Sequence, residues 1–199
     1  FLKANISVLN SKLFWRSKNI ELFYESNKGK VNFLNLDNEK NNLMHVYQND
    51  KFKKNLLKEI KIKKIKKIYK NIKNLNVLKN YDLIILCLGG NSTIYDKIIK
   101  DKSIQKDYNE IAVTGHVKHK IKNIKTSQFF LKEGPLAILP FSQNYFSFVW
   151  SLDKNFYEFK KEKISNYIKS KIEDLFKIKK NIQINNIQSY PIKMQLKTK

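Results

Sequence analysis

The chain has 199 residues, a length that suits one domain or one domain and part of another, and its formal net charge is +23. A hydrophobic content of 42% is enough for a packed core and excludes general disorder, while five glycines and three prolines exclude a collagen-like or linker-dominated chain. Cys87 is the only cysteine, which excludes an intrachain disulfide and a cysteine-based metal cluster.

The positive charge is almost entirely lysine, because Arg16 is the only arginine. Lys, Asn and Ile share A/T-rich codons, so one interpretation is that the composition of the genome accounts for the many lysines on a solvated surface. The other is attraction to a polyanion or an anionic membrane. No apolar run reaches the roughly 18 to 20 residues that a spanning helix needs, and no signal peptide is visible.

The first part of the chain predicts a hairpin followed by a helix. Residues 20–24 and 30–34 have strand composition and flank a turn-prone Asn27-Lys28-Gly29. Residues 38–42 form a polar loop. Phe52, Leu56 and Ile60 fall at i, i+4 and i+8, which predicts an amphipathic helix over residues 50–60. Residues 61–73 suit either a helix or strands, and their lysines suit either a solvated face or a phosphate-binding surface.

Residues 81–88 are continuously apolar, which predicts a strand buried on both faces, as in a parallel sheet covered by helices. Cys87 is then a small core residue. Gly89, Gly90, Asn91 and Ser92 end this strand. The two glycines suit either a plain tight turn or a close approach of the backbone to a ligand.

Residues 111–119 are expected to be extended, which puts His116 and His119 on opposite faces of a strand and makes them poor metal ligands. We therefore expect solvated or hydrogen-bonded histidines, His45 included, and no metal site.

The last third of the chain predicts an antiparallel pair of strands and a long helix. Residues 128–140 contain a turn at Glu133-Gly134-Pro135 and an apolar strand that ends at Pro140. Residues 145–151 form an aromatic strand, joined to the first through Ser142-Gln143-Asn144. Ile164, Ile168, Ile172 and Phe176 repeat every four residues, which predicts the helix.

No Gly-x-Ser-x-Gly, Walker-type loop or His-Glu-x-x-His occurs, so no residue is predicted to be catalytic. Two motifs carry a family resemblance instead. Residues 81–92 resemble the D-L-I-V-G-A-D-G-x-x-S segment of flavin-dependent aromatic hydroxylases. Residues 128–140, with Val149-Trp150-Ser151, look like the Q-R-F … G-P-L-A-L-L-P-L … V-W-S signature of the ubiquinone-biosynthesis branch, and Tyr190-Pro191-Ile192 resembles its Y/F-P-L.

The resemblance implies an FAD-dependent, NAD(P)H-using flavoprotein monooxygenase that hydroxylates the ring of a polyprenylated phenol with O2. The cofactor carries the oxygen chemistry and the protein positions the ring and excludes water. Implied partners are the polyprenyl-phenol, other ubiquinone-biosynthesis proteins and the membrane surface, with no specific nucleic acid. The implied location is cytoplasmic, peripheral on the inner membrane. The rival interpretation is a Lys-rich nucleic-acid or anionic-membrane binding module.

The fold class expected from the resemblance is α/β: part of a Rossmann-like FAD domain interleaved with an antiparallel-sheet substrate domain. We expect residues 1–92 in the FAD-binding domain, 93–192 in the substrate domain and 193–199 at the start of a return to the FAD domain. Gly89, Gly90, Asn91 and Ser92 are implied to approach the cofactor. Gly134, Pro135 and Leu136 are implied to lie near the substrate, with a merely structural turn as the alternative.

The sequence departs from the family pattern at several positions. Leu88 stands where the family has Asp, Phe129 stands where it has the Arg of Q-R-F, and the usual Arg after Ser92 is absent, with Tyr95 nearby. Neither the G-x-G-x-x-G that places a helix N-terminus under the FAD pyrophosphate nor the later G-D-A-A-H occurs. We therefore expect this sequence to be an internal portion of a longer protein, inactive alone.

Overall fold

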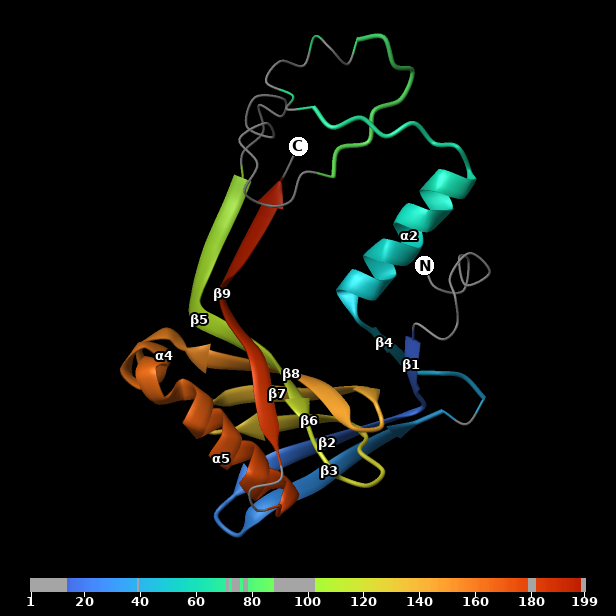
Figure 1. Ribbon diagram of the computed structural model, residues 1–199. Coiled ribbons are helices and arrows are strands. Elements are labelled where there is room, and N and C mark those ends of the chain that lie inside the picture. The colour runs from blue at the N-terminus through green and yellow to red at the C-terminus, as the bar shows by residue number, and fades with distance from the viewer. Residues whose placement is uncertain are drawn as a thin grey trace.

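The computed structural model describes residues 14–38, 40–70, 72, 76, 79–87, 103–178 and 182–197. Its centre is a seven-stranded sheet in the order β3-β2-β6-β7-β8-β5-β9 (Figure 1). The strands are β2 (Asn19–Ser26), β3 (Gly29–Asp37), β5 (Ser103–Lys118), β6 (Thr126–Leu131), β7 (Gly134–Ser142), β8 (Tyr145–Asp153) and β9 (Gln183–Lys197). β2 and β6 pair in parallel and the other neighbours are antiparallel, so the sheet is mixed.

Helices α4 (Lys154–Lys160) and α5 (Ile164–Phe176), joined by the 3₁₀ turn η3 (Lys161–Lys163), cover one face of this sheet (Figure 1). The Asp153 carboxylate caps α4 by accepting hydrogen bonds from the backbone N–H groups of Asn155 and Phe156, at 2.8 and 3.0 Å. The chain therefore turns from β8 directly into the helical layer.

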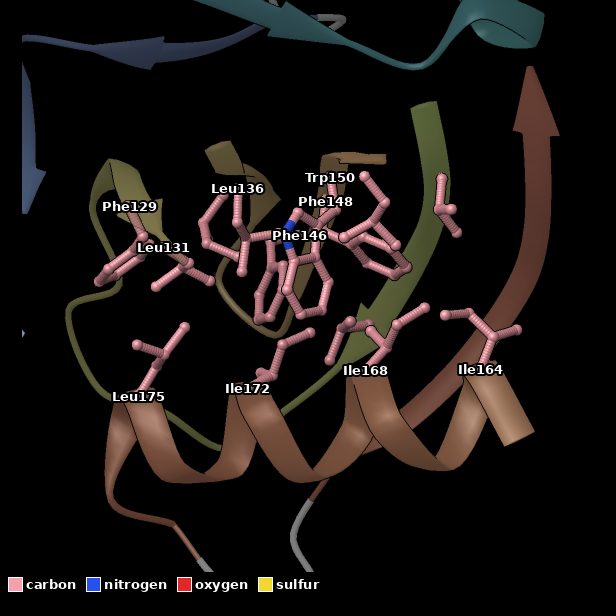
Figure 2. Close-up of a cluster of buried hydrophobic side chains, with 14 of the residues drawn as sticks. Phe129, Leu131, Leu136, Phe146, Phe148, Trp150, Ile164, Ile168, Ile172 and Leu175 are labelled. Carbon is pink, nitrogen blue, oxygen red and sulfur yellow. The ribbon is translucent and has the colours of Figure 1, made fainter. Parts of the chain in front are cut away.

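The core lies between α5 and the sheet. Ile164, Ile168 and Ile172 point from α5 at buried side chains of the strands (Figure 2). These strand residues are Phe129, Leu131, Leu136, Phe146, Phe148 and Trp150. The predicted helix and its apolar spacing are confirmed, because a residue every four positions returns to the same helix face.

A second, smaller unit packs beside the sheet. β1 (Phe14–Ser17) and β4 (Met44–Tyr47) form a two-stranded antiparallel sheet, followed by α2 (Asn49–Ile62). Phe52 of α2 anchors the helix, with its ring centroid 4.7 Å from that of Tyr47 and 6.3 Å from that of Phe14. A buried hydrogen bond of 2.8 Å between the hydroxyls of Ser17 and Thr126 ties this unit to β6.

The structure confirms the predicted hairpin, the helix predicted over residues 50–60, which is α2, and the β7–β8 pair. It also confirms the mixed α/β class with its largely antiparallel sheet. The hairpin β2–β3 joins the sheet through β6, so the sheet takes strands from both sides of the predicted boundary at residue 92. No helix in the described residues is long and apolar enough to cross a membrane.

Three predictions about individual segments were wrong. Residues 81–87 contain no strand, and Leu83 and Ile85 are each 77% exposed, so the expected burial on both faces does not occur there. Cys87 is exposed and is not a core residue. Pro140 does not end its strand, because β7 continues to Ser142 past an irregularity in the β7–β8 register, where a missing N–H is tolerated.

Candidate functional site

The face of the sheet opposite α5 carries small and aromatic side chains. Side chains alternate between the two faces of a strand, so the residues between the buried ones point away from the helical layer. They are Ala112, Thr114 and His116 of β5, Ala137, Leu139 and Phe141 of β7, and Tyr145, Ser147 and Val149 of β8. This open face is only partly buried, unlike the core face.

Two adjoining cavities lie where this face meets the β1–β4–α2 unit. Their volumes are about 430 and 350 Å³, and they share Gln48, Lys51, Phe141, Ser142 and Tyr145. We call them together the seam cleft. Its other lining residues are Phe14, Trp15, Gln143 and Asn144 on one side, and His116, Asn185 and Asn186 on the other. Two folding units therefore contribute to one hollow.

The lining of the seam cleft combines flat rings with amides and a cation. Phe141 lies with its ring centroid 5.4 Å from that of His116 and 6.0 Å from that of Tyr145. Gln48 precedes α2 but its side chain makes no capping hydrogen bond to the helix. Lys51 supplies a positive charge, and the described residues that line the cleft include no carboxylate. This arrangement suits a flat aromatic ligand with polar edges and a negatively charged group.

Gly89, Gly90, Asn91 and Ser92, the residues expected to approach a cofactor, lie outside the described residues. Their role stays a prediction.

The structure places Gly134, Pro135 and Leu136 at the start of β7. Phe141 lies seven positions after Gly134, which is roughly 23 Å along a strand, so this end of β7 is far from the seam cleft. Leu136 is fully buried in the core between the sheet and α5 (Figure 2). Contact of these three residues with a substrate stays a prediction. The description of the seam cleft does not depend on it.

Gly134 has a clear structural role. Its φ is +127°, which favours glycine, and a Cβ there would overlap the carbonyl oxygen of Ser151. Its own carbonyl accepts a hydrogen bond of 3.1 Å from the indole N–H of Trp150. The predicted turn is therefore packed closely against β8.

Beside this turn, a polar clamp joins α5 to the sheet. The Lys171 ammonium donates to Glu25 of β2 at 2.8 Å and to Glu133, in the β6–β7 turn, at 3.2 Å. The Tyr167 hydroxyl also donates to Glu133, and its ring stacks on Trp150 at 5.7 Å. Burial and the Glu133 carboxylate raise the pKa of Tyr167, so this hydroxyl remains protonated.

The histidines do not form a metal site. Among the described residues, no group of three or more His, Cys, Asp or Glu side chains could hold a metal ion. His119 lies just past the end of β5, is 2% exposed, and its Nδ1 accepts a hydrogen bond of 3.1 Å from the backbone N–H of Ile121. Burial lowers the pKa of His119, although that hydrogen bond opposes the shift, and the ring packs neutral against Phe146.

Sequence reasoning missed the seam cleft. The predicted helix over residues 50–60 includes Lys51 but not Gln48, and Ser142-Gln143-Asn144 was predicted only as a connection between two strands. Two signals were present: Phe141 and Tyr145 flank that turn, and both alternate with core residues, which puts them on the open face. That Gln48 and Lys51, at the start of α2, would lie beside this face needed the tertiary structure.

Comparison with known proteins gives a fold and no sequence relative. No protein-family model matches the chain, and no curated protein matches it in sequence. Among solved structures, it is similar to CmlS, a flavin-dependent halogenase, with a TM-score of 0.56, 12% identity and coverage of 98% of this chain and 39% of that one.

Two structures of the flavin-dependent brominase Bmp2 are also similar. A triple mutant gives a TM-score of 0.56 at 11% identity, covering 98% of this chain and 55% of the brominase. Bmp2 itself gives a TM-score of 0.51 at 11% identity, with 98% and 53% covered. The chain thus shares the fold of part of these solved structures and spans between 39% and 55% of their length.

Proposed function

We propose that this chain is part of a flavin-dependent oxidative enzyme, and that the seam cleft is where the flavin and an aromatic substrate meet. The observation that carries the proposal is the position of the cleft on the open face of a sheet whose fold is shared with flavin-dependent halogenases. The helical layer covers one face, so the opposite face is free to form the wall of a binding site.

The residues lining the cleft fit the cofactor class. A flavin ring is flat and apolar on its faces and carries hydrogen-bonding groups along its edge. Trp15, Phe141 and Tyr145 offer flat contacts, while the amides of Gln48, Gln143 and Asn144 both donate and accept hydrogen bonds. When bound, FAD would supply the redox chemistry that activates O2, with NAD(P)H as the reductant.

The protein's own residues would then bind and orient the substrate ring that is oxidised, and they would exclude water from it. Aromatic walls exclude water, which strengthens charge interactions inside the cleft. Lys51 would hold an anionic oxygen of the substrate, such as that of a phenolate. No side chain of the cleft is needed as a nucleophile.

The finer proposal is that the substrate is a polyprenylated phenol of ubiquinone biosynthesis and that the reaction is ring hydroxylation. It is supported by the resemblance of residues 128–140 and 149–151 to the signature of that branch. On the same basis we propose that Gly89, Gly90, Asn91 and Ser92 approach the cofactor.

Phe141→Ala tests the cleft directly. Removing this ring from the wall should loosen the position of the substrate, and the product formed per NAD(P)H consumed should fall roughly tenfold, with hydrogen peroxide released instead. The measurement is the ratio of hydroxylated product to NAD(P)H oxidised. It is made on the wild type and on the variant, each produced in and purified from the natural source.

Phe159→Ala is the matched control, because Phe159 of α4 is 82% exposed and is not among the residues lining the cleft. It should keep the wild-type ratio. Equal ratios for wild type and Phe141→Ala would remove the seam cleft from the proposal.

A further inference from the structure

Helix α2 and the segment after it form an apolar surface that nothing in the described structure covers. α2 contains no buried residue, although Phe52 fixes it to β1 and β4. Large apolar side chains are exposed along it and beyond: Leu56 (38%), Leu57 (36%), Ile62 (61%), Ile65 (57%), Ile68 (59%) and Tyr69 (85%). Figure 1 shows α2 standing clear of the sheet and of α4 and α5.

The same stretch carries the densest positive charge of the described chain. Residues 51–70 include ten lysines and a single acid, Glu59. In the part of the chain that the structure describes, none of these lysines forms a salt bridge with a carboxylate. The charge is therefore available to an anionic partner.

The combination of lysines and exposed aliphatic side chains identifies that partner. A basic amphipathic helix lies in the interface of an anionic bilayer, with its apolar residues among the acyl chains and its lysines at the headgroups. A second copy would be repelled by the like charge. A nucleic acid would take the lysines but leave Leu56, Leu57 and Ile62 in water, at a cost in hydrophobic free energy.

We propose that α2 and residues 63–70 form a docking surface for an anionic lipid bilayer. Leu56 and Leu57 insert, together with the apolar side chains that follow α2, and the lysines contact headgroup phosphates.

Docking of this surface would place the seam cleft beside the membrane, because Gln48 and Lys51 at the start of α2 also line the cleft. A polyprenylated substrate could then pass its ring into the cleft while its tail stays in the bilayer. This consequence rests on the proposed function, whereas the docking itself does not.

The experiment is co-sedimentation of the 199-residue chain, without flavin, with vesicles of phosphatidylcholine alone and of phosphatidylcholine and phosphatidylglycerol mixed about three to one. We expect binding to the anionic vesicles, weakened by salt, and little binding to the neutral ones. The triple variant Lys53→Gln/Lys54→Gln/Lys58→Gln should lower the affinity about 100-fold, at roughly fivefold for each lysine. Leu56→Asn/Leu57→Asn should also lose binding while the chain stays folded.

The matched control is Lys154→Gln/Lys161→Gln/Lys163→Gln, which removes the same charge from α4 and η3 and should bind within about twofold of wild type. Equal losses in the two triple variants, or no binding to anionic vesicles, would overturn the proposal. So would tight binding to duplex DNA that the Lys53, Lys54 and Lys58 substitutions abolish while vesicle binding persists. Because no flavin is present, a failure here leaves the proposed function standing, and the reverse also holds.

Discussion

Replacing Gly134 by valine is expected to lower the free energy of unfolding by about 3–5 kcal/mol, measured by urea denaturation of the chain. Two costs add at this position. The φ of +127° strains any residue with a Cβ, and that Cβ would overlap the Ser151 carbonyl oxygen, which belongs to the backbone of β8 and cannot move aside alone.

Gly29→Ala separates the two costs. Gly29 also has a positive φ, +112°, but a Cβ at this position would have no neighbouring atom within 4 Å. It should lose only about 1–2 kcal/mol, whereas Gly134→Ala should lose clearly more. Similar losses at the two glycines would contradict the packing described here. If a Gly134→Ala protein from the natural source kept normal coupling of NAD(P)H oxidation to product, Gly134 would be a turn residue alone.

Lys171→Met is expected to destabilise the chain by about 2–4 kcal/mol at neutral pH. The Lys171, Glu25 and Glu133 side chains are only 16%, 23% and 16% exposed, so Lys171→Met leaves two carboxylates largely out of water without the ammonium that both contact. The exposed pair Lys161–Glu158 is the control, and Lys161→Met should change stability by less than about 0.5 kcal/mol.

The effect of Lys171→Met should depend on pH. Burial disfavours the charged Glu25, but Lys171 and the Lys132 N–H outweigh it and hold its pKa below the usual 4.5. A lowered folded-state pKa stabilises the fold above the unfolded pKa, and this contribution is lost as the pH falls through the folded value. The gap between wild type and Lys171→Met should therefore shrink in acid below about pH 4.5.

At the alkaline end the sign is opposite. Burial disfavours the charged Lys171, but Glu25 and Glu133 outweigh it and raise its pKa above 10.5. This contribution is full below the unfolded pKa and is lost as the pH rises through the folded value.

On the acid side, a stability difference between wild type and Lys171→Met that stayed constant from about pH 3 to neutrality would show that the clamp is not electrostatic.

The elements that the sequence predicted well are those in which local periodicity and tertiary burial agree. Ile164, Ile168 and Ile172 mark one face of a helix, and the structure buries that face. The aromatic strand at 145–151 alternates between core and open face, with Phe146, Phe148 and Trp150 all fully buried. In these segments the spacing of the apolar residues predicts which face of the helix or strand is buried.

Other features depend on partners that the local pattern does not specify. The apolar run 81–87 predicts burial, but no described strand pairs with it. β9 was not predicted, because Tyr190-Pro191-Ile192 was seen as a motif and the mixed polar sequence around it becomes a strand through pairing with β5. The seam cleft likewise depends on the start of α2, with Gln48 and Lys51, lying beside the open face.

The flavin content of the protein purified from its natural source tests whether it is part of a flavin-dependent enzyme. We expect about one flavin for each polypeptide, because the seam cleft is proposed to hold the flavin ring. We expect none on the isolated 199-residue chain, because its sequence lacks the G-x-G-x-x-G loop that binds the pyrophosphate. Flavin absorbance per mole of protein distinguishes the outcomes: stoichiometric flavin in the natural protein supports a flavin-dependent function, and a colourless natural protein would contradict it.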